Sequence, residues 1–122
     1  MALMIYDTRR KQKVLFKPIN PGKISMYVCG VTVYDLCHLG HARCYVAFDV
    51  VHRWLESSGY DVTYIQNFTD IDDKIITRAN EKGIDFLELV DENINAYYED
   101  MDALNILRAD EYPRCTEYVE QM

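Results

Sequence analysis

The chain has 122 residues, 49% hydrophobic and 27% charged, as is typical of one globular domain that can bury a core. Its formal net charge of −7 argues against a broad basic surface for nucleic acid. No apolar run reaches the roughly 18 residues that span a bilayer, and the N-terminus lacks the pattern of a signal peptide, so we expect a cytoplasmic protein with no membrane partner.

The N-terminal segment predicts a β-hairpin. Apolar residues at 3–6 and 14–16 flank a polar stretch that contains Arg9, Arg10 and Lys11. Residues 1–60 carry 8 Lys+Arg against 4 Asp+Glu, whereas residues 61–122 carry 5 against 16. The basic stretch could contact phosphate or could be a solvated turn, and the pattern leaves both open.

The next segment predicts a strand, a helix and a second strand. Apolar residues alternate over 24–28 and the run ends at Gly30. Residues 42–57 predict a helix because Val46, Val50 and Trp54 recur at four-residue steps, and Gly59 ends it. Residues 60–67 are β-branched and aromatic. A strand–helix–strand unit of this kind predicts two parallel strands.

Two further helices are expected. Residues 69–81 open with acidic side chains and stop at Gly83. A third helix is predicted to begin after Asp85 and to run to about Leu104. Its expected apolar stripe comprises Leu87, Val90, Ile94, Tyr97, Met101 and Leu104. Pro113 marks a break, and residues 116–122 predict the start of another helix.

The motif His38-Leu39-Gly40-His41 follows the first strand after a short loop and opens the helix. Two histidines three residues apart can face one ligand, and Gly40 permits close approach to the backbone. Imidazole and helix N–H groups together could bind phosphate oxygens and stabilise charge that builds up there. In isolation the motif is weak, since two capping histidines would look the same. Its place beyond a buried strand favours a nucleotide site.

The cysteines at 29, 37, 44 and 115 form no C-x-x-C pair, so we expect free thiols and no self-contained zinc knuckle. Cys29 ends the first strand and is either a small core residue or a metal ligand. Asn67 and Thr69 follow the second strand and could hydrogen-bond a sugar or an amino acid. The carboxylates of Asp72 and Asp73 are better explained by helix capping.

Four segments match, in order and spacing, the cysteinyl-tRNA synthetase family of class I aminoacyl-tRNA synthetases. They are Met26–His41, 47–51, Asn67–Ile75 and Asp102–Leu107. The chain resembles this family over nearly its whole length. The resemblance implies an α/β fold, the first half of a Rossmann-like (HUP-type) parallel-sheet catalytic domain. It implies three parts: a β-hairpin and turn at 1–22, the first Rossmann half at 23–83, and a helical start of the connective-peptide insert at 84–122.

The resemblance also implies a reaction: ATP-dependent activation of cysteine, with Mg²⁺, to cysteinyl-adenylate, and transfer to tRNA(Cys). His38 and His41 would be catalytic and would bind ATP together with Gly40. Cys29 would be one ligand of a zinc ion that selects the substrate thiolate over the hydroxyl of serine. The residues implied to line the cysteine or adenylate site are Cys29, Gly30, Thr32, Cys44, Asn67 and Thr69. Family members usually have a small hydroxyl residue where Cys44 stands.

Family members are several times longer than this chain. Their other zinc ligands, their lysine-rich KMSKS loop and their anticodon-binding helices come from later sequence. We therefore expect an N-terminal piece that is inactive alone and that contributes little to tRNA binding. Two alternatives stay open: the cysteine ligase of mycothiol synthesis, which shares the adenylate chemistry but not the tRNA acceptor, and a non-catalytic nucleotide-binding fragment.

Overall fold

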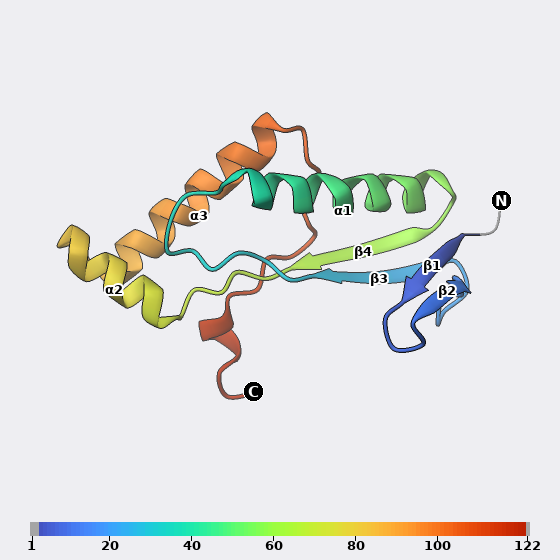
Figure 1. Ribbon diagram of the computed structural model, residues 1–122, viewed down its shortest axis with the longest axis horizontal. Coiled ribbons are helices and arrows are strands. Elements are labelled where there is room, and N and C mark those ends of the chain that lie inside the picture. Colours follow the sequence, from blue (N-terminus) through green and yellow to red (C-terminus); the bar gives the residue numbers. More distant parts are fainter. Residues whose placement is uncertain (1–2, 122) are drawn as a thin grey trace.

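The computed structural model describes residues 3–121 (Figure 1). Its strands and helices, in chain order, are β1 (Met4–Asp7), β2 (Gln12–Leu15), β3 (Lys23–Val28), α1 (Leu39–Ser57), β4 (Asp61–Gln66), α2 (Asp73–Lys82), α3 (Phe86–Ala103) and a 3₁₀ turn, Cys115–Tyr118. None of these helices is both long and apolar enough to cross a membrane.

The central unit is the parallel pair β3 and β4, which confirms the predicted strand–helix–strand unit. The strands are in register from Lys23 opposite Asp61 to Val28 opposite Gln66. In Figure 1, α1 and α3 lie on the same side of this pair, and the hairpin lies at the end where β3 and β4 begin. Both strands therefore run toward the end of the molecule where α1 begins.

The N-terminal hairpin is also confirmed, as an antiparallel pair of β1 and β2. Its turn is fixed by Asp7, whose Oδ1 accepts hydrogen bonds from the backbone N–H groups of Arg9 and Arg10 at 2.9 and 3.0 Å. This side-chain acceptor is a common device of tight turns.

The C-terminal ends of α1 and α2 lie at the glycines that predicted them, but both helices begin at residues other than the predicted ones. Gly59 and Gly83 have φ of +88° and +66°, the left-handed conformation that glycine adopts without strain. α1 begins at Leu39, three residues earlier than predicted, because His38 caps it. α2 begins only at Asp73, because Asp72 accepts a hydrogen bond from the N–H of Lys74 and so acts as the N-cap.

The apolar stripe of α1 does not face the core. Val46, Val50 and Trp54 are 41%, 61% and 40% exposed. Val50 and Trp54, together with β3, line an open groove of about 700 Å³. The helix instead buries Tyr45, Asp49, His52 and Leu55. Periodicity identified the helix, but it could not identify which face packs, because the buried face includes the polar side chain of Asp49, which accepts the N–H of Leu107.

The stripe predicted for α3 is wrong at both ends. Leu87 and Leu104 are 63% and 46% exposed, and Leu89 is fully buried in place of Leu87. The middle of the prediction is confirmed: the buried residues include Val90, Ile94, Tyr97 and Met101.

The segment after α3 is not the helix that the sequence predicted over residues 116–122. A short 3₁₀ turn covers Cys115–Tyr118, and residues 104–118, here called the return segment, run back beside β4. Ile65 bridges Glu111 and Phe68 bridges Arg114, both in parallel orientation. Backbone hydrogen bonds to β4 and to the residues just after it satisfy residues 110–115, and the side chain of Asp70 accepts the N–H of Thr116 at 3.0 Å. Met122 lies outside the described residues.

A buried polar chain crosses the core. The Tyr64 hydroxyl donates to Gln66 Oε1 at 2.9 Å, and Gln66 Nε2 donates to the hydroxyl of Tyr97. Gln66 and Tyr97 are each 2% exposed. Burial of the ring raises the pKa of Tyr97 far above its ordinary value, so its hydroxyl stays neutral.

Replacing Tyr97 with Phe should lower the free energy of unfolding by roughly 1–3 kcal/mol, because the buried amide of Gln66 loses its acceptor. Urea denaturation of the chain measures this. Tyr98→Phe is the matched control, since it removes a hydroxyl from the ring beside Tyr97 that takes no part in the Gln66 hydrogen bonds. Equal losses in the two variants would contradict the polar chain as the cause.

The loops that follow β3 and β4 meet at one close contact. A Cβ added to Gly30 would lie 1.5 Å from the carbonyl oxygen of Asn67, so only glycine fits there. The N–H of Gly30 donates to Asn67 Oδ1 at 2.8 Å, and Asn67 is 9% exposed. The two strand ends are thereby held together.

Gly30→Ala should lower the free energy of unfolding by about 3 kcal/mol or more, because the backbone of Asn67 must move to make room for the new Cβ. This is the upper end of the loss that core overpacking usually causes. Gly59→Ala provides the control, because nothing lies within 4 Å of its Cβ and only its positive φ is disturbed, at about 1 kcal/mol. Urea denaturation compares the two. A Gly30→Ala variant as stable as Gly59→Ala would show that the strand ends are free to separate.

Candidate functional site

The first half of the site lies in the loops after β3 and β4. Beyond Gly30 and Asn67, the loops continue to pair: the N–H of Thr69 donates to the carbonyl of Val31 at 2.9 Å, and the N–H of Val33 donates to that of Thr69 at 3.2 Å. Thr32 and Thr69 form an isolated parallel bridge. The sequence-predicted residues Cys29, Gly30, Thr32, Asn67 and Thr69 therefore lie together, at the carboxyl ends of parallel strands.

The second half of the site is the start of α1. His38 is the N-cap of the helix, and the rings of His38 and His41 are stacked with centroids 3.8 Å apart and an interplanar angle of 14°. Both histidines therefore lie on one side of the turn, as their spacing predicted. Burial, and then the neighbouring His38, lower the pKa of His41.

The first turn of α1 offers fewer unpaired N–H groups than the sequence suggested. The N–H of Gly40 donates to His38 Nδ1 at 3.1 Å, and the N–H of His38 donates to His41 Nδ1 at 3.3 Å. The histidine side chains take up backbone donors that were expected to face a ligand.

Tyr45 joins the two halves and was not among the predicted site residues. Its hydroxyl donates to the carbonyl of Cys29 at 3.4 Å, and its ring is 3% exposed. It lies one helical turn after His41, so it fixes the start of α1 relative to the end of β3. Its position four residues from a motif histidine was the only sequence signal for this role.

The cysteines divide by environment, and all four are free thiols. Cys29 and Cys44 are exposed, and Cys44 lies on α1 near His41. Cys37 is half-buried, and burial, with Asp100 nearby, raises the pKa of its thiol to about 11. Cys37 is therefore a poor thiolate ligand.

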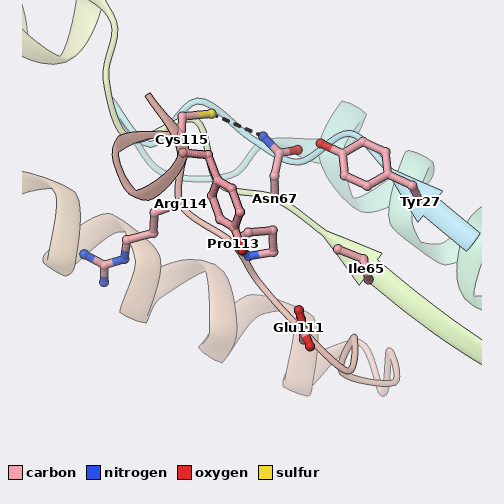
Figure 2. Close-up of a pocket in the computed structure, with 8 residues that line it drawn as sticks. Tyr27, Ile65, Asn67, Glu111, Pro113, Arg114 and Cys115 are labelled. Carbon is pink, nitrogen blue, oxygen red and sulfur yellow. Dashed lines mark hydrogen bonds between the residues drawn. The ribbon is translucent and has the colours of Figure 1, made fainter. Parts of the chain in front are cut away.

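Cys115 brings the return segment into the site, which the sequence did not predict. Asn67 Nδ2 lies 3.5 Å from Thr69 Oγ1 and 3.6 Å from Cys115 Sγ. Asn67 and Cys115 line an open cavity of about 360 Å³. Figure 2 shows these two side chains with Tyr27 of β3 and Ile65 of β4, which line the same cavity. Arg114 and Pro113 complete that side of the cavity.

A zinc site would need three or four ligands, and Cys29 is the ligand that the sequence predicts within this chain. Cys29 has an exposed thiol at the strand end. Within residues 3–121, no group of three or more histidine, cysteine, aspartate or glutamate side chains is arranged to hold a metal. The described chain therefore does not form a complete zinc site.

Comparison with known proteins identifies the family. Residues 15–122 match the family model described as "tRNA synthetases class I (C) catalytic domain". Two relatives, both named cysteine–tRNA ligase, are 59% identical: one from Azotobacter vinelandii over 100% of this chain, and one from Aromatoleum aromaticum over 98%. The chain spans 26% of the length of each.

Solved structures agree on the fold. A methionyl-tRNA synthetase of Mycobacterium tuberculosis, in complex with methionyl-adenylate, aligns with a TM-score of 0.68 at 26% identity. The alignment covers 75% of this chain and 18% of that one. The parallel β3–β4 unit with its helices is thus the start of a class I synthetase fold, as the sequence predicted. The chain belongs to the family of class I tRNA synthetase catalytic domains.

Proposed function

We propose that this chain is the N-terminal part of a cysteine–tRNA ligase. The whole protein would activate cysteine with ATP and Mg²⁺ to cysteinyl-adenylate, and would transfer the cysteinyl group to tRNA(Cys) in the cytoplasm. The observation that carries the proposal is the 59% identity, over the whole chain, to relatives named for that activity. Those names favour a tRNA acceptor over the acceptor of mycothiol synthesis.

In this proposal the two halves of the site bind different parts of the adenylate. His38 and His41 donate hydrogen bonds to the phosphates of ATP at the N-terminus of α1, where the helix dipole also favours negative charge. Asn67 and Thr69 hold the sugar or the amino acid at the strand ends. Cys44, on the exposed side of α1, lines the same crevice. Donors that bind more strongly as charge builds up on the α-phosphate lower the barrier.

We further propose that Cys29 is one of several zinc ligands, the rest coming from sequence outside this chain. The exposed thiol beside Gly30 supports this role. When bound, zinc would favour a thiolate over a hydroxyl and so separate cysteine from serine. A shaped pocket alone separates such close analogues only weakly.

The 122-residue chain alone should catalyse no detectable cysteine-dependent exchange between ATP and pyrophosphate. It holds one proposed zinc ligand and none of the lysine-rich loop expected in later sequence. The full-length protein from the same reading frame serves as the positive control and should be active. Cysteine-dependent exchange by the short chain would refute the assignment of essential groups to later sequence.

Cys29→Ser in the full-length protein should abolish bound zinc and reduce the preference for cysteine over serine to roughly 100-fold or less. Metal analysis and exchange rates with each amino acid measure the two effects. Cys37→Ser is the matched control, since that half-buried thiol with its raised pKa should leave the zinc content unchanged. Full zinc content in Cys29→Ser would exclude Cys29 as a ligand.

A further inference from the structure

In the turn that opens α1, the side chains of the two histidines accept hydrogen bonds from backbone N–H groups of the same turn. His38 is extended, with φ of −119° and ψ of 171°, and its Nδ1 accepts the N–H of Gly40 at 3.1 Å. His41 reaches back, and its Nδ1 accepts the N–H of His38 at 3.3 Å. Each imidazole thus uses the same ring nitrogen, Nδ1, as an acceptor from the backbone.

A neutral imidazole has one N–H and one nitrogen with a free lone pair. A backbone N–H can bond only to the lone pair, so the proton of each ring must be on Nε2. We propose that this turn fixes His38 and His41 as neutral Nε2–H tautomers, which makes them a stacked pair of uncharged hydrogen-bond donors. This inference rests on the proposed function only for the ligand that the donors would serve, the phosphates of ATP.

Protonation of either ring would oppose this arrangement in two ways. An imidazolium has a proton on Nδ1, which would point at a backbone N–H and remove the cap. Two charged rings with centroids 3.8 Å apart would also repel each other. The lowered pKa of His41, caused by burial and then by His38, agrees with a neutral pair.

Gly40 leaves the space that the His38 ring occupies in this turn. Its φ is not positive, so the backbone conformation does not require glycine. A Cβ at this position would instead lie 2.8 Å from His38 Cε1 and 3.0 Å from His38 Nδ1. Alanine would push the His38 ring off the Gly40 N–H without meeting other atoms, so Gly40 is a positioning residue for His38.

Imidazole ¹⁵N NMR of the labelled chain at about pH 8, without ATP or cysteine, tests the inference. The chain has three histidines, and spectra of His38→Gln, His41→Gln and His52→Gln assign them. We expect His38 and His41 each to show one tautomer, with a protonated Nε2 and an unprotonated Nδ1. A protonated Nδ1, or an average of the two tautomers, at either residue of the wild-type chain would overturn the proposal.

Two variants test the part played by Gly40. Gly40→Ala should keep the helical circular dichroism but should lose the single tautomer at His38. Leu39→Ala is the matched control, since Leu39 is 85% exposed, and it should leave both tautomers unchanged. A wild-type His38 signal in Gly40→Ala would exclude Gly40 as its positioning residue. Since no substrate is present, these results stand whether or not the full-length protein shows the proposed activity.

Discussion

The close contact between Gly30 and Asn67 is the constraint on which the site depends. Two parallel strands end side by side, and the loops that leave them would diverge without a link. The carbonyl of Asn67 occupies the space of a missing Cβ at Gly30, and its side chain accepts the Gly30 N–H at 2.8 Å. Pairing then continues between Thr69 and Val31. The residues after both strands therefore form one hydrogen-bonded backbone unit, which fixes the donors and acceptors that a ligand there would meet.

Where the return segment is not paired with β4, charged side chains of other segments hydrogen-bond to it. Asp49 of α1 accepts the N–H of Leu107 at 2.9 Å, and Arg53 donates to the carbonyl of Asn105 at 2.6 Å. Farther along, Asp70, only 3% exposed, accepts the N–H of Thr116 at 3.0 Å and also its hydroxyl proton. Irregular backbone must satisfy its polar groups by some means, and side-chain acceptors do so here.

These links explain what the sequence could and could not predict. The strands and helices followed from local patterns, and Gly59 and Gly83 marked two helix ends, because turn geometry is local. The buried face of α1 was not predictable, since it includes the carboxylate of Asp49, which accepts the N–H of Leu107, 58 residues away. The helix expected over residues 116–122 is replaced by a short 3₁₀ turn, at whose start the side chain of Asp70 accepts the N–H of Thr116. A contact over 46 residues leaves no local sequence pattern.

The site shows the same division between local and distant causes. The pairing of His38 with His41 depends on residues within one turn, so their spacing alone predicted that they lie together. Cys115 reaches Asn67 only through a contact between residues 48 positions apart, and no pattern indicated it.

Tyr45 connects the histidine pair, which depends on local contacts, with the strand ends, which depend on distant ones. Its helix position ties it to His41, its hydroxyl ties it to Cys29, and its ring packs edge-on against Tyr97 with centroids 5.6 Å apart. The distance between the histidine pair and the strand ends is thus set by the aromatic core. A change in that core that leaves every site residue in place can still alter the geometry of the site, because close-packed interiors transmit small displacements.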